Sequence, residues 1–239
     1  MTAFSADSIE STTVVGYQIQ TVGEAYSLQV ASFQGIGVST YNIQDLKPSA
    51  PEGTALGGGV FDLQTLDETG GMSEQFYYMT VADDYGITKD GWYNDDGETF
   101  STKTFERGEG FMFNNSTGAS AGLTFSGAVY TNEVTVVAPE AYSLMGNIRP
   151  MNLSIQDLVP VAPGGTAVGG GVFDLQTLDE AGGMAEQFYY MTAADDYGIT
   201  KDGWYNDDGE TLSTKVFSPA EGFMFNNSTG ASAGLKYKK

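Results

Sequence analysis

The sequence predicts an all-β protein of two tandem, similar domains, each a β-sandwich or a barrel-like fold. Three observations support this: short segments of alternating apolar and polar residues, Gly-, Asp- and Asn-rich clusters between them, and an internal repeat. Residues 53–123 match residues 165–235 at a constant offset of 112 without a gap, and 62 of these 71 positions are identical. A repeat unit of this size has the length of a small domain, whereas solenoid units have about 20–50 residues.

The landmarks upstream of the long match extend both copies. Residues 24–28 (EAYSL) match residues 140–144 at offset 116, and residues 43–46 (IQDL) match residues 155–158 at offset 112, so the first copy carries four extra residues between these landmarks. We therefore expect a flexible N-terminus over residues 1–10, a first domain over residues 11–127 and a second domain over residues 128–239.

Within each copy, the apolar residues alternate with a period of two, which is typical of strands. In the first copy the alternating apolar residues are Val15, Tyr17, Ile19, Phe61, Leu63, Phe111, Phe113, Leu123 and Phe125. Gly-rich or Asp/Asn-rich turns separate the runs, as at residues 57–59 and 94–97. A turn or two of helix is expected from Asn42, which can cap it, to Leu46, ended by Pro48, with a counterpart at residues 154–158.

Composition and charge exclude several classes of function. The chain has no Cys and no His, which excludes a disulfide framework, a thiol nucleophile, imidazole-ligated zinc and a His-dependent triad. Its 31 acidic and 10 basic residues give a net charge of -21, which disfavours nucleic acid and anionic lipid as partners. No run approaches the roughly 20 apolar residues of a membrane-spanning helix, so we expect no membrane insertion. With no nucleophile–base motif and no indication of a buried acid pair, the sequence predicts no enzymatic activity.

An acidic segment, residues 82–99, recurs unchanged at residues 194–211. Carboxylates crowded around Gly-rich turns are the oxygen ligands that calcium takes, although the spacing is not that of an EF-hand. The alternative is a pair of solvated hairpin loops that keep the protein soluble. The candidate calcium ligands are Asp83, Asp84, Asp95 and Asp96, and Asp195, Asp196, Asp207 and Asp208.

The only two Trp residues lie within these acidic segments, each followed by Tyr. An exposed Trp-Tyr pair beside carboxylates can stack on a sugar ring and bind its hydroxyls. This makes Trp92, Tyr93, Trp204 and Tyr205 candidate carbohydrate-binding residues. The alternative is that each Trp packs in the core of its domain.

The boundary between the copies predicts a mode of assembly. Residues 11–22 precede the EAYSL landmark as residues 127–138 precede its second copy, so the N-terminal strand corresponds in position to the strand that links the copies. If the linking strand pairs with copy one, copy two has a vacant edge that the N-terminal strand of a neighbouring molecule can fill. The residues predicted to form this contact are Val15, Tyr17, Ile19, Leu235 and Tyr237. The apolar alternation of the two strands agrees only at offset 117, which requires a bulge. The equal alternative is that residues 1–22 fold back into their own domain.

These landmarks also carry a resemblance. The motifs at residues 14–17 (VVGY), 24–28 (EAYSL), 91–92 (GW), 108–111 (GEGF) and 123–127 (LTFSG) resemble a β-rich repeat of uncharacterised secreted bacterial proteins. The resemblance covers nearly the whole chain, once per copy, and implies a secreted β domain without known catalytic residues. In copy two, residues 219–223 (PAEGF) and a shorter end depart from it.

The sequence therefore predicts a secreted or cell-surface bacterial structural protein, a subunit of a filament, sheath or matrix joined head to tail by strand donation. The alternative is a module that binds carbohydrate or another surface ligand, with calcium as a possible cofactor. The expected partner is a second copy of the chain or a carbohydrate.

Overall fold

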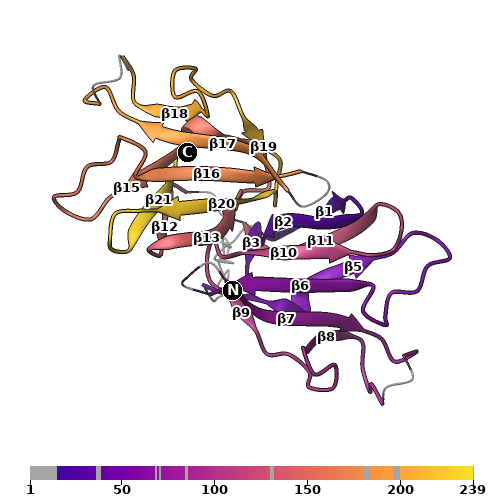
Figure 1. Cartoon of the computed structure of the whole chain (residues 1–239). Coiled ribbons are helices and arrows are strands. Elements are labelled where there is room, and N and C mark those ends of the chain that lie inside the picture. Colours follow the sequence, from indigo (N-terminus) through magenta and orange to yellow (C-terminus); the bar gives the residue numbers. More distant parts are fainter. Residues whose placement is uncertain are drawn as a thin grey trace, which may run out of the picture.

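The computed structural model describes residues 15–35, 39–67, 69, 71–83, 86–129, 132–179, 183–195 and 200–238, and these residues confirm the all-β class (Figure 1). The strands of the first half are β1 (Val15–Val22), β2 (Ala25–Val30), β3 (Phe33–Gln34), β4 (Tyr41–Asn42), β5 (Lys47–Ser49), β6 (Phe61–Leu66), β7 (Met72–Met79), β8 (Gly91–Asn94), β9 (Thr104–Phe105), β10 (Gly110–Asn115) and β11 (Ala121–Val129). Those of the second half are β12 (Val134–Ala138), β13 (Ala141–Gly146), β14 (Leu153–Ser154), β15 (Leu158–Val161), β16 (Phe173–Leu178), β17 (Met184–Met191), β18 (Gly203–Asn206), β19 (Val216–Phe217), β20 (Gly222–Asn227) and β21 (Ala233–Tyr237).

Each half is a two-layer antiparallel sandwich with the same strand order. One layer has five strands, ordered β2-β10-β6-β7-β8 in the first half and β13-β20-β16-β17-β18 in the second. The other layer is built on β11, which pairs with β1 on one side and with β3 and β5 on the other; its counterpart is β12-β21-β15. Two short pairs, β4-β9 and β14-β19, complete the halves. Because β11 continues to Val129, the change from one half to the other falls slightly beyond residue 127.

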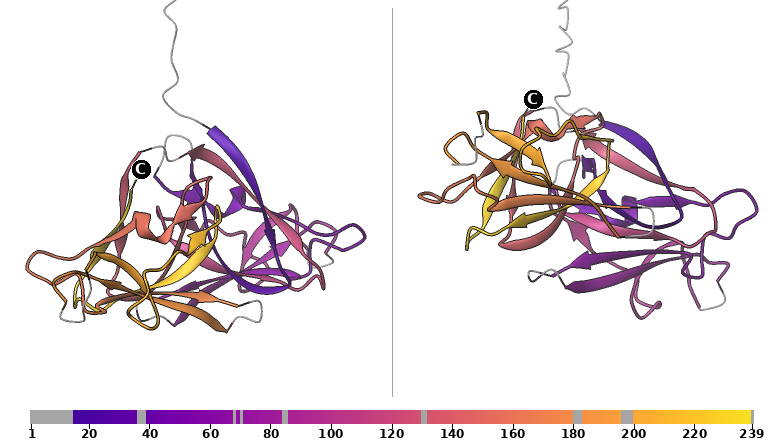
Figure 2. Two further views of the ribbon diagram at one scale, coloured as in Figure 1. Left: turned by 90° about the horizontal axis from the view of Figure 1, so that it is seen from above. Right: turned by 45° about the horizontal axis from the view of Figure 1, so that its top comes forward.

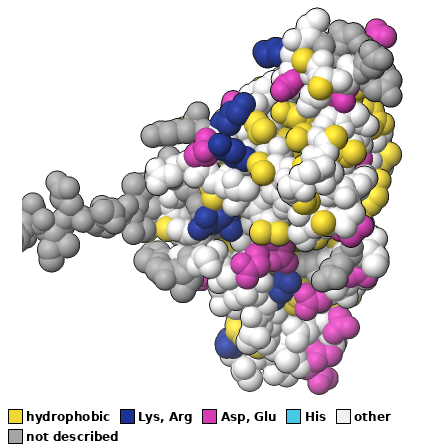
Figure 3. All heavy atoms as spheres, turned by 90° about the vertical axis from the view of Figure 1, so that its left-hand side faces the viewer, with side chains coloured by type: hydrophobic (Ala, Val, Ile, Leu, Met, Phe, Trp, Pro, Cys, Tyr) yellow, Lys and Arg dark blue, Asp and Glu magenta, His cyan; other side chains and the backbone are white. Residues whose placement is uncertain are grey.

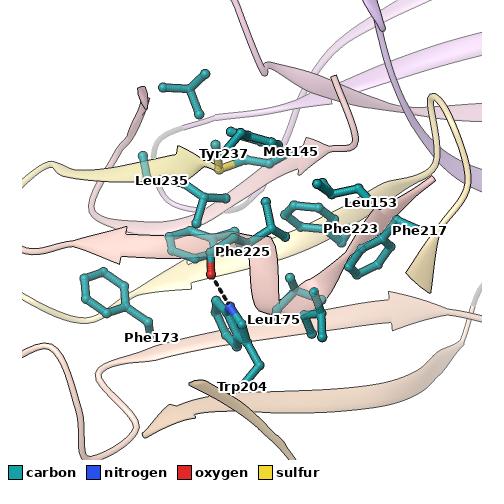
Figure 4. Packing of buried hydrophobic residues seen from close by; sticks show 14 of the residues in the cluster. Met145, Leu153, Phe173, Leu175, Trp204, Phe217, Phe223, Phe225, Leu235 and Tyr237 are labelled. Carbon is teal, nitrogen blue, oxygen red and sulfur yellow. Dashed lines mark hydrogen bonds between the residues drawn. The ribbon is translucent and has the colours of Figure 1, made fainter. Parts of the chain in front are cut away.

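The core of each half lies between its two layers and is rich in aromatic rings. In the first half, Phe111 and Phe113 of the five-stranded layer pack with Phe125 of the other layer, and all three are fully buried. In the second half, Phe223 and Phe225 pack with Tyr237, the counterpart of Phe125, and all three are fully buried (Figure 4). Alternation therefore places one side of each strand in the core, as the sequence predicts.

The helical turns predicted from the sequence are short 3-10 helices, Ile43–Asp45 and Ile155–Asp157. Asn42 caps the first, because its side chain accepts a hydrogen bond from the backbone N–H of Gln44, and Ser154 caps the second in the same way. Pro48 lies in the strand that follows the first turn. The predicted tight turn at residues 57–59 is also present, with positive φ at Gly58 (72°) and Gly59 (76°).

The two halves lie side by side (Figure 2), and each contributes a residue to the core of the other. Val30, at the end of β2, is fully buried in the core of the second half, and Ala220, just before β20, is fully buried in the core of the first. The N–H of Val30 donates to the carbonyl oxygen of Ala220 at 3.0 Å. Neither core is therefore complete without a residue from the other half.

Candidate functional site

The Trp-Tyr pairs are buried, so the exposed sugar-stacking surface predicted at Trp92, Tyr93, Trp204 and Tyr205 does not exist. Both Trp side chains are 0% exposed, and the two Tyr side chains are 3% and 5% exposed. The Trp92 Nε1–H donates to the carbonyl oxygen of Leu46 at 2.8 Å, and Trp204 makes the same bond to Leu158 (Figure 4). Core packing, the alternative weighed from the sequence, is therefore what the structure shows. The physical reason is that an alternating strand places Trp on the core side of the sheet whatever the charge of the neighbouring loops.

Two candidate calcium ligands in each half accept hydrogen bonds from backbone N–H groups of their own turns. Asp83 accepts a hydrogen bond from the backbone N–H of Thr80, and Asp96 accepts from the backbone N–H groups of Glu98 and Thr99. Asp195 and Asp208 repeat these bonds, while Asp95 and Asp207 lie in the same turns. Within the described ranges no group of three or more acidic residues is placed to hold a metal ion. Asp84 and Asp196 lie outside the described residues, and calcium binding stays a prediction.

Strand β1 folds back on its own half. All eight of its residues pair with β11, from Val15 opposite Ala128 to Val22 opposite Ala121. In the second half, β12 pairs with β21 in the corresponding register, with Ala138 opposite Ala233. The N-terminal strand and the linking strand thus occupy equivalent positions, at offset 116 and without the bulge that offset 117 requires.

The vacant edge expected in the second half is absent from the described strands. β21 is paired with β12 on one side and with β15 on the other, and its Leu235 and Tyr237 are fully buried. These two residues therefore belong to the core rather than to an acceptor edge. β1, the strand that we expected one molecule to donate to the next, therefore pairs within its own half.

The side chains of β1 alternate in an unusual way, because the apolar ones face solvent and the polar ones face inward. Val15, Tyr17 and Ile19 point outward and are 57%, 74% and 61% exposed. Gln18 and Gln20 point inward, opposite Phe125 and Leu123, and the Gln18 Oε1 is buried without a hydrogen-bond partner. The short connection to β2 determines which side chains of β1 face inward, because only two residues separate the two strands. The same number of residues separates β12 from β13.

Strand β12 shows the usual arrangement in the same place. Its Val136 and Ala138 are buried, whereas Thr135, which corresponds to Ile19, points outward. β1 is also an edge strand, bonded only to β11 among the described strands. The apolar, exposed side of this edge is the first candidate functional surface, which we call the β1 edge.

The second candidate surface is a row of side chains across the outer face of each five-stranded sheet. In the first half, strand pairing places Tyr26, Asn114, Asp62 and Tyr77 next to one another on β2, β10, β6 and β7. In the second half, the same row is Tyr142, Asn226, Asp174 and Tyr189. We call these the Asp62 row and the Asp174 row.

Amide side chains surround each central carboxylate. Asp62 accepts hydrogen bonds from the Nδ2 of Asn114 at 2.7 Å, the Nε2 of Gln64 at 3.4 Å and the Nε2 of Gln75 at 3.5 Å. Asp174 accepts from Asn226 at 2.7 Å and from Gln176 at 3.1 Å. Asp62 is 6% exposed, and no described Lys or Arg forms an ion pair with it. Burial raises the pKa of both carboxyl groups above the ordinary value of 3.8, although the amide hydrogen bonds oppose this shift.

Sequence reasoning missed these rows. Their members come from four strands that are distant in the chain, and their alternation with core residues shows only that they face away from the core. No local spacing indicates that Asn114 lies beside Asp62, which is 52 residues away.

The raised pKa values predict that these two carboxyl groups stabilise the fold more at low pH than at neutral pH, which is the opposite of a carboxyl group with a lowered pKa. The native state holds the protons of Asp62 and Asp174 more tightly than the unfolded chain, so their contribution to stability falls as pH rises from about 3.8 through the native pKa. We expect wild type to gain stability relative to the Asp62→Asn, Asp174→Asn protein when the pH is lowered from near 7 to near 4. Urea unfolding of both proteins at the two pH values measures this difference.

An opposite-sign control is available at the acidic turns. Hydrogen bonds from Thr99 lower the pKa of Asp96 below the ordinary value of 3.8, so wild type should lose stability relative to Asp96→Asn as the pH falls from about 4 through the native pKa. If the free energies of unfolding of wild type and the Asp62→Asn, Asp174→Asn protein differ by the same amount at both pH values, the pKa values of Asp62 and Asp174 are not raised.

Two clefts adjoin the rows at the junction of the halves. One, of about 700 Å³, is lined by Tyr142, Leu144 and Val136, and the other, of about 620 Å³, by Tyr26, Leu28 and Thr177. The Asp174 row therefore ends at the first cleft and the Asp62 row at the second. Clefts of this volume suit ligands of small-molecule size.

No described helix has the length and apolar character needed to cross a membrane. The chain matches no protein-family model, no curated protein and no solved structure.

Proposed function

We propose that this chain is a structural subunit of a bacterial extracellular or cell-surface assembly whose copies associate through the β1 edge. The observation that carries the proposal is an eight-residue edge strand with Val15, Tyr17 and Ile19 turned toward solvent. Long, apolar edge strands are the surfaces through which β proteins pair, and natural proteins ordinarily protect them with charge or Pro. β1 contains neither a charged residue nor Pro.

The charge distribution favours a second copy at this place. Acidic side chains are spread over the face of the molecule that Figure 3 shows, and copies that each carry a net charge of -21 repel one another at long range. β1 and its partner β11 contain no charged residue, so two copies can approach there without bringing like charges together.

Edge pairing between identical strands is self-complementary. With Tyr17 of each copy opposite its equivalent, an antiparallel pair places Val15 beside Ile19 of the second copy and satisfies backbone groups of both edges. Such a contact is isologous and closes as a twofold dimer. The dimer is then the building block, and growth of a filament or sheath requires a further contact elsewhere.

The second half shows which residues the fold accepts at the positions of Tyr17 and Ile19, and these residues can be used in a test. At offset 116, the counterparts of Tyr17 and Ile19 are Glu133 and Thr135. We expect wild type to elute as a dimer or larger species, and the Tyr17→Glu, Ile19→Thr protein as a monomer. Light scattering coupled to size exclusion, over a wide range of concentrations, measures the mass.

The matched control is Val137→Lys, which changes an equally exposed apolar residue on β12 (72% exposed) and should leave the association intact. A monomeric wild type at the highest concentration, or association that persists in the Tyr17→Glu, Ile19→Thr protein, would refute the proposal.

A further inference from the structure

We propose that the Asp62 row and the Asp174 row are two equivalent binding sites for a neutral polysaccharide, each continuing into its adjoining cleft. The inference is independent of the β1 edge, which lies in the other layer of the sandwich. It depends on three properties of the rows: their polar groups, their charge and their shape.

Each row presents a ready arrangement of hydrogen-bonding groups. The floor is Asp62, which is nearly buried, while Asn114, Gln75 and the two Tyr side chains of the row remain partly exposed around it. The bonds to Asp62 use the amide N–H groups of Asn114, at 2.7 Å, and of Gln75, at 3.5 Å, so Asp62 does not occupy the carbonyl oxygen of either amide. Their carbonyl oxygens can then accept hydrogen bonds from ligand hydroxyls, and the Tyr hydroxyls can donate or accept.

The chemistry of the row selects an uncharged, hydroxyl-rich ligand. An anionic ligand needs a cation, and no described Lys or Arg pairs with Asp62 or Asp174. A metal ion needs several acidic ligands, and the described residues contain no such group. A sugar ring fits, because its hydroxyls both donate and accept while its apolar face can rest on Tyr26 or Tyr77.

The shape of the surface suits a chain rather than a single sugar. Tyr26 belongs to the Asp62 row and also lines the 620 Å³ cleft, and Tyr142 joins the Asp174 row to the 700 Å³ cleft. Each row and its cleft therefore form a continuous surface from the middle of the sheet to the junction of the halves. Two such sites in one chain raise the apparent affinity for a polymer, because the second contact is intramolecular.

Native gel electrophoresis in gels that contain hydroxyethyl cellulose, galactomannan or dextran tests the proposal. We expect at least one of these neutral polysaccharides to retard wild type relative to a polysaccharide-free gel. Gln75→Ala should reduce the retardation by removing one site. Gln187 is the counterpart of Gln75 at offset 112, on β17 beside Gln176, and Gln75→Ala with Gln187→Ala should abolish the retardation. The Gln75 Nε2 lies 3.5 Å from the Asp62 oxygen, so the substitution removes only a weak internal bond and should leave the melting temperature unchanged.

Two further variants keep the outcome decisive. Asp95→Asn with Asp207→Asn changes exposed residues of the acidic turns, which belong to neither row and line neither cleft, and should bind as wild type does. Asn114→Ala with Asn226→Ala removes the shortest bond to each Asp and should also abolish retardation. Unchanged wild-type mobility in all three gels would overturn the proposal, as would wild-type retardation of both row variants with native melting temperatures.

Discussion

Replacing Trp204 by Ala should lower the free energy of unfolding by about 3–5 kcal/mol, the largest effect we expect from a single substitution. The indole is fully buried and packs edge to face against Tyr190 and Phe225, with ring centroids 5.4 and 6.3 Å away. Its removal leaves a cavity that the two-layer core cannot easily close, and it leaves the carbonyl oxygen of Leu158 without its donor. At roughly 2–4 °C per kcal/mol for a chain of this size, the melting temperature should fall by about 10 °C.

Trp92 gives a parallel measurement in the first half, because its packing and hydrogen bond are the same. Trp204→Phe, which keeps most of the packing and loses the indole N–H, should cost less than half as much. Chemical unfolding followed by circular dichroism measures both. A loss below about 1 kcal/mol for Trp204→Ala would contradict the packing described here.

Replacing Gln44 by Ala should cost about 2–4 kcal/mol, although the side chain is only partly buried and lies on a short 3-10 turn. Its Nε2 donates to the carbonyl oxygens of Trp92 and Ser101 at 2.8 and 2.9 Å, and its Oε1 accepts from the N–H of Trp92 at 3.0 Å. One amide thus satisfies three backbone groups beside β8. Its loss removes one hydrogen bond from each of these groups, of which the carbonyl oxygen of Trp92 keeps the bond from the N–H of Ser101 at 2.9 Å.

The repeat provides the controls for this measurement. Gln156 makes the same three bonds to Trp204 and Ser213, so Gln156→Ala should have an effect of similar size. Asp45→Ala, next to Gln44 but exposed, should change stability by less than about 0.5 kcal/mol. Equal effects of Gln44→Ala and Asp45→Ala in urea unfolding would show that the three hydrogen bonds of the Gln44 side chain do not contribute to stability.

The fold class could be predicted from the sequence because it depends on local signals. Alternation at Phe111 and Phe113 marks a strand, and Asn42 followed by Pro48 marks a short capped turn; both are confirmed. Alternation states which residues share a side of a strand but not which side faces the core. For β1, the two-residue connection to β2 and the pairing with β11 decide this, and they turn the apolar side outward.

The candidate sites could be predicted less well, because they depend on which strands are neighbours. The order β2-β10-β6-β7-β8 places Tyr26 beside Asn114 and Asn114 beside Asp62, and no local pattern encodes that order. The acidic residues near Trp92 suggested an exposed side chain, but they lie in the loops beyond the strand and do not determine which way the Trp92 side chain points. The sequence showed which residue types are available, and the topology determined which of them meet.

The exchange of Val30 and Ala220 between the cores limits how this architecture can grow. In an open repeat array each unit offers one surface to the unit before it and another to the unit after it, so units can be added one at a time. Here the same junction is used by both halves at once, and it leaves no equivalent surface for a third. We expect a lengthened relative to contain an even number of such halves, added as self-contained pairs, and a single half expressed alone to expose an unfilled core.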